Sequence, residues 1–191
     1  MSPALAKTSE KDILTAARRL VRQNGVEGLS MRDVADAVGI RAPSLYKRFD
    51  NREALLRAVR DQAQAQFDGH LAAAVKDHSP AQALTKLAGA YRDFARRRPA
   101  IYRLLHRPEL APARGNVSGV TMQVVSGLVG RAHADAATRC ISAFLHGFVS
   151  MEMDGLYSGP GSASADEAFA YSVYVILQGL VNSADSGGGQ S

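Results

Sequence analysis

Apolar residues recur at intervals of three and four along most of this chain, which is the spacing of one buried helix face. Between positions 12 and 24 the apolar set comprises Ile13, Leu14, Ala17, Leu20 and Val21. Between positions 31 and 38 it comprises Met31, Val34, Ala35 and Val38. No run of alternating apolar and polar residues is long enough to require a strand. The pattern therefore predicts an all-α fold of about nine helices.

The segment 30–49 carries the local signals of two short helices joined by a turn. Ser30 can cap a helix whose first turn holds Asp33, and Gly39 provides the backbone freedom at which helices often end. Pro43 suits the first position of the next helix, because its missing N–H is not needed there. Apolar residues then return to helical spacing at Leu45, Tyr46 and Phe49. Two helices in this arrangement form a helix-turn-helix, whose second helix enters the major groove of DNA.

Caps and breakers predict the ends of the other helices. The first helix ends before Gly25, and a fourth begins at Arg52, after the cap at Asp50-Asn51, and runs to about Asp77. We expect a loop over 107–116. We expect further helices from the Ser79-x-x-Gln82 capping box, from Pro99, over 117–129, from a cap at Asp135 to about Gly155, and from the Ser164-x-x-Glu167 capping box to about Ala184.

Several of these features occur together in a known order. They are the Ala16-Ala17 pair, Gly25, Gly39, the Leu45-Tyr46-x-x-Phe49 run and the Arg52-Glu53-x-Leu55-Leu56 helix start. Residues 13–56, which read ILTAARRLVRQNGVEGLSMRDVADAVGIRAPSLYKRFDNREALL, resemble the DNA-binding domain of TetR-family transcriptional regulators. The resemblance implies a helix-turn-helix domain over residues 10–56 and a helical ligand-binding and dimerisation domain over residues 57–184.

The charge of the chain is concentrated in its first third. Residues 1–60 hold 12 Lys and Arg against 7 Asp and Glu, whereas residues 61–191 hold 11 of each, so the net charge of +5 lies at the N-terminal end. A basic balance confined to one domain is typical of a surface that binds phosphates. A merely solvated basic surface is the alternative interpretation.

Ten residues of this region are candidates for DNA contact. The turn and the start of the second helix are expected to reach base edges, and an arginine there can bind guanine through two hydrogen bonds. These base-edge candidates are Arg41, Ala42, Pro43 and Ser44. The phosphate candidates are Ser30, Arg32, Tyr46, Lys47, Arg48 and Arg52. The resemblance supports Tyr46, Lys47 and Arg52 in particular, although histidine is common in the family where this chain has Lys47. A packed Tyr46 and a solvated Arg48 are the alternatives.

The last predicted helix is uncharged between Glu167 and Asp185. It carries one apolar row of Phe169, Val173, Ile176 and Leu180 and a second row of Tyr174, Leu177 and Val181. A helix that is apolar over so wide an arc is covered on more than one side, by its own core and by a partner chain. A membrane span is disfavoured, because the stretch is short and Ser172, Gln178 and Asn182 interrupt it. We expect no membrane partner.

A second resemblance concerns the C-terminal half. The segments AYRDFARRRPAIYRLL and FLHGFVSMEMDGLY resemble the ligand-binding domain of a TetR subgroup in which a His-Gly pair, here His146-Gly147, marks helix eight. A tryptophan common about one turn earlier in that subgroup is absent. The resemblance implies a homodimer through helices eight and nine and a small-molecule pocket enclosed by helices four to eight. The candidate lining residues are Phe67, Tyr91, Phe94, Tyr102, Met122, Phe144, His146 and Phe148. Ordinary core packing is the alternative for each.

The chain lacks the usual motifs of catalysis. There is no Gly-x-Ser-x-Gly elbow, no phosphate loop and no His or Cys pair at metal-ligand spacing, so we expect neither an enzyme nor a metal or other cofactor. Cys140 is the only cysteine, and no signal-peptide pattern is present, which favours a cytoplasmic bacterial setting. We predict a repressor that binds a pseudo-palindromic operator on double-stranded DNA and is released by a small-molecule effector. A non-specific architectural DNA-binding protein is the alternative.

Overall fold

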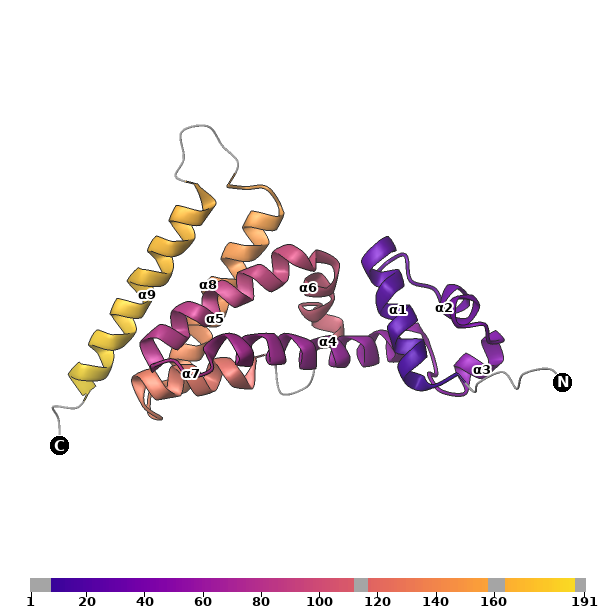
Figure 1. Ribbon diagram of the computed structural model, residues 1–191, viewed down its shortest axis with the longest axis horizontal. Helices are drawn as coiled ribbons and strands as arrows, with labels where there is room; N and C mark the ends of the chain where they lie inside the picture. The colour runs from indigo at the N-terminus through magenta and orange to yellow at the C-terminus, as the bar shows by residue number, and fades with distance from the viewer. Residues whose placement is uncertain (1–7, 112–116, 158–163, 188–191) are drawn as a thin grey trace. The chain divides into compact units, whose positions relative to one another are not determined.

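The structure is a computed structural model that describes residues 8–111, 117–157 and 164–187. Every regular element within these residues is helical, so the predicted all-α fold of about nine helices is confirmed. In chain order they are α1 (Glu10–Asn24), α2 (Met31–Val38), α3 (Ala42–Tyr46), α4 (Arg52–Val75), α5 (Pro80–Arg97), α6 (Pro99–Leu105), the 3-10 helix η1 (Pro108–Leu110), α7 (Gly119–Val129), α8 (Ala134–Met153) and α9 (Ala165–Gly187) (Figure 1).

Side-chain caps fix several of the helix starts. Ser9 and Asp12 form a reciprocal capping box, so α1 begins two residues earlier than the apolar pattern alone predicts. The predicted box at the start of α9 is confirmed, because the Ser164 hydroxyl accepts from the Glu167 N–H at 3.2 Å and the Glu167 carboxylate accepts from the Ser164 N–H at 3.0 Å. Such boxes satisfy backbone donors that the first helical turn leaves free.

Some predicted boundaries are wrong. Asp135 does not cap α8: the helix begins at Ala134 after His133, which makes no side-chain cap bond, and Asp135 instead pairs with Arg139 one turn later at 2.9 Å. The expected loop over 107–116 contains η1, and its residues 112–116 lie outside the described residues. Helix α4 ends at Val75, because Asp77 has a left-handed backbone with φ 59° that does not continue a helix.

The described residues form two units. The first comprises residues 8–65 and 98–111, and the second comprises residues 66–97, 117–157 and 164–187, so α4 contributes to both. Segment 98–111 joins the first unit because α6 packs on α1. The division into domains 10–56 and 57–184 stays a prediction, since it follows chain order and places α6 with the later helices.

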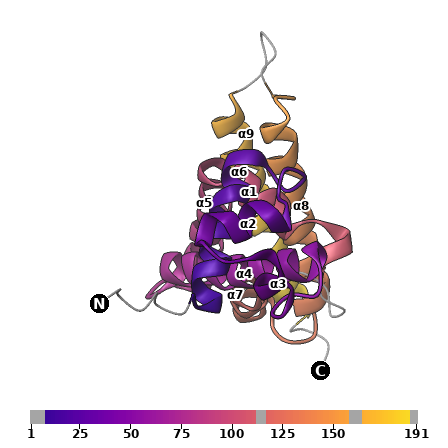
Figure 2. The ribbon, with the colours of Figure 1, turned by 90° about the vertical axis from the view of Figure 1, so that its right-hand side faces the viewer.

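Each unit has a core of its own. In the first, α1 packs on α2 and α6, and α2 packs on α3. Figure 2 shows the molecule with α1, α2 and α3 toward the viewer. Its fully enclosed side chains include Ile13, Ala17, Val21, Val34 and Leu45. In the second, α7 packs on α5, α8 and α9. Its enclosed side chains include Leu84, Leu87, Val125, Ile141 and Leu145. Most of the apolar positions read from the sequence are therefore buried or half-buried, with Tyr46 and Tyr174 as exposed exceptions.

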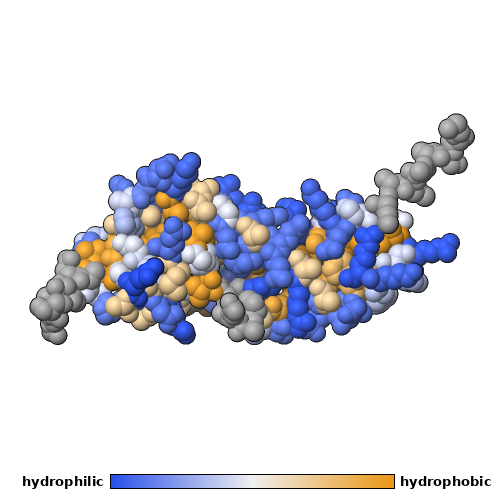
Figure 3. Space-filling view, turned by 90° about the horizontal axis from the view of Figure 1, so that it is seen from below, coloured by the Kyte–Doolittle hydropathy of each residue, from blue (hydrophilic) through white to orange (hydrophobic). Residues whose placement is uncertain are grey.

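The face of the molecule shown in Figure 3 carries hydrophilic side chains interspersed with hydrophobic ones. None of the described helices is both long and apolar enough to cross a membrane.

Candidate nucleic-acid interface

The turn between α2 and α3 is held by local bonds at both ends of α2. The Ser30 hydroxyl accepts from the Asp33 N–H at 3.1 Å and donates to its carboxylate at 2.6 Å. Gly39 has φ 71° and ψ 31°, a left-handed conformation that strains any other residue except asparagine or aspartate. The Ile40 N–H bonds back to the Ala35 carbonyl at 3.0 Å, which closes the end of the helix. The chain can therefore turn sharply and begin α3 at Ala42.

Helix α3 is anchored on one side and open on the other. Leu45 is completely buried and Phe49 is buried, and the Phe49 N–H bonds to the Leu45 carbonyl at 3.0 Å. The regular helix ends at Tyr46, three residues short of Phe49, and Lys47 and Arg48 lie in a turn. Two apolar anchors thus fix a very short helix whose Pro43, Ser44 and Tyr46 side chains are exposed.

The structure places most of the predicted DNA-contact residues together on this outward side. Tyr46 is 49% exposed, so the alternative that it is a packed core residue is wrong. Ser30 and Ala42 are half-buried, while the exposed members are Arg32, Arg41, Pro43, Ser44, Tyr46, Lys47 and Arg48. Their contacts with DNA stay predictions.

The cations of this surface are largely unpaired. No carboxylate among the described residues lies within ion-pair distance of Arg41, Lys47 or Arg48, and the one pair that Arg32 makes, with Asp36, is long at 3.8 Å and exposed. Exposed pairs of this kind contribute little. The positive charge of Arg41, Lys47 and Arg48, which flank α3, therefore remains available to a polyanion.

Arg52 differs from these residues because its guanidinium is bound within the protein. Its Nε donates to the Leu29 carbonyl at 2.8 Å and its Nη2 donates to the Val26 carbonyl at 2.5 Å. Nη2 also lies 3.5 Å from the Glu27 carboxylate. The predicted phosphate contact of Arg52 stays a prediction, but the structure assigns it a structural role as well, in holding the loop between α1 and α2.

Two residues, Glu27 and Arg107, extend the contacts of Arg52 and were not identified from the sequence. Arg107, which follows α6, pairs with Glu27 at 2.5 Å and with Glu109 at 2.6 Å. The hydrogen bond from Arg107, its charge and the charge of Arg52 lower the pKa of the Glu27 carboxyl below its ordinary value. No local pattern could have identified this pair, because its members are far apart in the chain and each is an ordinary surface charge.

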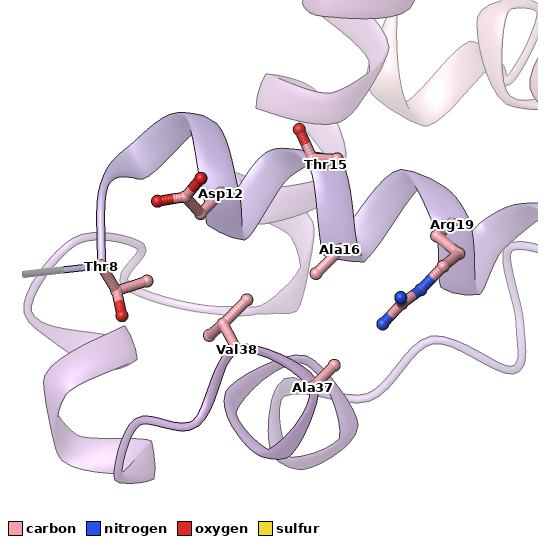
Figure 4. A pocket seen from close by; sticks show the side chains of 7 residues that line it. All are labelled: Thr8, Asp12, Thr15, Ala16, Arg19, Ala37 and Val38. Carbon is pink, nitrogen blue, oxygen red and sulfur yellow. The ribbon is translucent and has the colours of Figure 1, made fainter. Parts of the chain in front are cut away.

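A shallow groove lies between α1 and the end of α2 (Figure 4). It encloses about 350 Å³, and its walls carry Thr8, Asp12, Thr15, Ala16, Arg19, Ala37 and Val38. Asp12 is already engaged in the capping box of α1, whose hydrogen bonds from Ser9 lower the pKa of the carboxyl. The groove is therefore lined by α1, by Thr8 just before it and by the end of α2, which packs on α1.

Known protein families match both parts of the chain. The family described as bacterial regulatory proteins, tetR family, matches residues 13–59, and the tetracyclin repressor-like C-terminal domain family matches residues 84–176. An uncharacterized HTH-type transcriptional regulator of Mycobacterium tuberculosis is 30% identical over 96% of this chain and 86% of its own length. The chain belongs to the TetR family. It is a DNA-binding transcriptional regulator.

Solved structures agree with the fold of this TetR-family chain. A protein of unknown function from Rhodococcus sp. RHA1 superimposes with a TM-score of 0.75 at 24% identity, covering 95% of this chain and all of that one. A TetR variant from Acinetobacter baumannii, solved in complex with minocycline, superimposes with a TM-score of 0.65 at 20% identity, covering 91% of this chain and 96% of that one. TetR-family regulators bind operators and dimerise.

The aromatic residues predicted to line an effector pocket are mostly packed against one another in this TetR-family regulator. Phe67 lies edge-on to Tyr91 at 5.2 Å and to Phe94 at 4.9 Å between ring centroids. Phe144 and Phe148 form another group, at 5.8 Å, which Phe169 joins. Rings in such contact stabilise a core, so core packing accounts for these residues without a ligand.

The remaining candidates for the effector pocket are Tyr102, Met122 and His146. Tyr102 belongs to the first unit, where its ring lies 4.3 Å from that of His106. Met122 is half-buried, and its sulfur accepts from the Thr138 hydroxyl at 3.5 Å. His146 lies on an exposed position of α8, where partial burial lowers its pKa. The role of the His-Gly pair and the binding of a ligand by any of the eight residues stay predictions.

A buried arginine joins three helices of the second unit. Arg92 on α5 donates through Nε to Glu152 on α8 at 2.8 Å and through Nη2 to the same carboxylate, and it pairs with Asp166 on α9 at 2.8 Å. Its guanidinium lies 4.7 Å from the ring centroid of Phe169 and 5.7 Å from that of Phe148. The paired carboxylates raise the pKa of Arg92. The sequence signalled none of these contacts.

Proposed function

We propose that this TetR-family chain is a repressor that binds a pseudo-palindromic operator as a homodimer and leaves it when a small-molecule effector binds. The observation that carries the proposal is the exposed cationic surface of Arg41, Lys47 and Arg48, which flank α3 directly after the capped helix α2. In this proposal the base-edge contacts come from Arg41, Ala42, Pro43 and Ser44. The phosphate contacts come from Ser30, Arg32, Tyr46, Lys47, Arg48 and Arg52.

Exposed apolar side chains on α8 and α9 support the homodimer. Tyr171 is 71% exposed, Tyr174 59%, Val175 47% and Met151 44%. The three residues of α9 follow helical spacing, so they share one face, and large apolar side chains gathered on one exposed face mark an interaction surface. A dimer through this face would present two copies of α3 to half-sites about 34 to 36 Å apart, one turn of the DNA helix.

The effector we propose is apolar or aromatic, because the candidate lining residues in the second unit are largely so. The Acinetobacter TetR variant, which shares this fold, was solved in complex with minocycline, and this supports a small-molecule effector. Release requires that the effector bind more tightly to the DNA-incompetent state, since a ligand with equal affinity for both states shifts nothing. A regulator of this kind acts where the chromosome is, so we place it in the cytoplasm, and we assign it no catalytic activity.

Selection of bound DNA from a random pool tests the proposal. We expect enrichment of one inverted repeat, with binding at least about 10³-fold tighter than to bulk DNA. A ratio near one would favour the architectural alternative. Repeating the selection in the presence of a panel of metabolites and drugs should identify a compound that abolishes enrichment. By linkage, the operator must weaken the binding of that compound by the same factor.

The dimer is tested by placing a charge on its proposed face. Tyr174→Glu should convert dimer to monomer in light scattering coupled to gel filtration, because a carboxylate would be buried without a partner. Thr85→Glu, at an exposed position of α5, provides the matched control and should leave the mass unchanged. Equal masses for the wild type and Tyr174→Glu would contradict this interface.

A further inference from the structure

We propose that Glu27 and Arg107 are positioning residues for operator binding. Together with Arg52 they form what we call the loop clamp, a chain of contacts from the start of α4 through Glu27 to the segment after α6. The loop clamp holds the loop 25–30, from which α2 begins. This inference rests on the proposed binding of an operator by α2 and α3, and it adds to the DNA-binding unit a residue that lies outside the matched helix-turn-helix region, residues 13–59.

The first half of the loop clamp fixes the backbone of the loop. Arg52 donates to the carbonyls of Val26 and Leu29, and the Leu29 N–H bonds to the Val26 carbonyl at 3.3 Å. Ser30, the cap of α2, follows directly. Hydrogen bonds from a charged donor are stronger than those between neutral groups. The position of α2, and through it of α3, therefore depends on where Arg52 holds this loop.

The second half ties the same loop to a distant segment of the first unit. The side chain of Arg107 is 29% exposed and holds the Glu27 carboxylate on one side and the Glu109 carboxylate on the other. These two partners raise the pKa of Arg107, as Arg107 and Arg52 lower that of Glu27. Glu27 is thus a shared partner of Arg52 and Arg107. Through Glu27, the position of segment 98–111 affects the position of the loop that Arg52 binds.

An open groove beside this contact leaves room for the loop to shift. The groove has a volume of about 480 Å³, and Asn24, Gly25, Val26, Glu27, Ala100, Arg103 and Arg107 line it. Side chains on opposite sides of such a groove do not constrain one another by van der Waals contact. The apolar packing of α6 on α1 fixes the helices, and the pair between Glu27 and Arg107 adds a direct polar connection to the loop itself.

The effect of the loop clamp should appear in DNA binding more than in stability. Glu27 is 76% exposed, and exposed ion pairs contribute little to folding. Contacts with base edges and phosphates, by contrast, require α3 to be held in one orientation. Loss of a positioning contact would reduce the fraction of molecules whose α3 is correctly placed, and the apparent affinity would fall by that fraction.

The direction in which one substitution changes the operator affinity tests the proposal. Glu27→Ala removes a negative charge from a DNA-binding unit, which by charge alone should strengthen binding. The loop clamp predicts the opposite, about threefold to fivefold weaker binding to the selected operator duplex in fluorescence anisotropy. The control Asp36→Ala removes the same charge from the exposed end of α2 and should bind as well as the wild type or better. Equal or tighter binding by Glu27→Ala would overturn the proposal.

A double-mutant cycle shows whether the two residues act through each other. Arg107→Ala should weaken operator binding by a similar factor. The double variant, which carries Glu27→Ala and Arg107→Ala, should have an operator affinity no lower than that of the single variant with the lower affinity. Arg107→Lys, which keeps a charged partner for Glu27, should restore most of the affinity. Additive losses, or no rescue by lysine, would contradict a shared positioning role.

Two further measurements separate this proposal from its alternatives. If Arg107 touched DNA directly, its removal would flatten the dependence of affinity on salt by about one unit, whereas a positioning residue leaves that slope unchanged. Unfolding by urea should give the same midpoint for all variants, which excludes a general loss of structure. Failure of the wild type to bind any operator would refute the proposed function, and wild-type binding with unaffected variants would refute the loop clamp alone.

Discussion

Arg92 and Arg41 show that the two units use arginine in opposite ways. Arg92 is buried, has two carboxylate partners and lies close to two phenylalanine rings. Arg41 is exposed at the start of α3 and has no carboxylate among the described residues within ion-pair distance. A buried charge that loses its partner is costly to the fold, whereas an exposed unpaired charge can be removed with little effect on stability. The first kind holds helices together, and the second is available to another molecule.

The largest expected effect is on stability and comes from removing the buried arginine, Arg92. Arg92→Ala should lower the free energy of unfolding by about 3 kcal/mol, because it leaves Glu152 largely buried without its cation. Urea denaturation followed by circular dichroism measures this loss. Arg96→Ala, which removes an exposed arginine of the same helix, should change stability by less than about 0.5 kcal/mol. Similar losses in the two variants would contradict a different role for the buried and the exposed arginine.

Removing the exposed arginine should change recognition and leave the fold intact. Arg41→Ala should reduce discrimination at one base pair of each half-site by about 1 to 3 kcal/mol, as expected when a bidentate contact with guanine is lost. Competition between the operator duplex and duplexes with a single base change measures this discrimination. The urea midpoint should not move. Uniform weakening across all sequences would instead make Arg41 a phosphate contact.

A smaller effect is expected from the neighbouring lysine. Lys47→Ala should weaken binding to all sequences alike and flatten the plot of log affinity against log salt by about one unit, because one phosphate loses its cation. Anisotropy titrations at several salt concentrations provide the slope. An unchanged slope would remove Lys47 from the set of DNA contacts.

The smallest effect concerns the exposed carboxylate of Glu27. Its pKa is lowered in the folded protein, mainly by the hydrogen bond from Arg107, so Arg107→Ala should raise it toward the ordinary value of 4.5. Carboxyl-detected NMR titration of the two proteins measures the change. Because the folded pKa lies below the unfolded one, the contribution of this pair is present above about pH 4.5 and is lost as the pH falls through the folded pKa. An equally low pKa in the variant would mean that Arg107 is not its cause.

The sequence predicted those parts of the fold that short-range chemistry determines. Helix α2 starts after Ser30 and ends before Gly39, and the capping box of Ser164 and Glu167 marks the start of α9. These ends could be predicted because each cap acts within four residues of the helix end. The exposed set around α3 was equally predictable, since the apolar anchor Leu45 fixes which side faces outward.

What the sequence could not predict depends on residues that only the fold brings together. Arg92 and Glu152 are 60 positions apart, and nothing in their local patterns distinguishes them from ordinary surface charges. The orientation of Arg52 toward Val26 and Leu29 is of the same kind. The aromatic residues present a different problem, because helical spacing predicts which of them are buried but not whether Phe67 and Phe94 leave a gap or fill it.

The inclusion of segment 98–111 in the first unit has a practical consequence for protein engineering. A sensor built by grafting residues 1–59 onto a foreign effector domain would lack α6, whose buried side chains pack on α1, and would also lack Arg107. The apolar side of α1 that contacts α6 would then be open to solvent. A modular exchange of DNA specificity between regulators of this architecture therefore has to transplant two separate stretches of chain, and each junction needs to be chosen so that Glu27 and Arg107 come from the same parent.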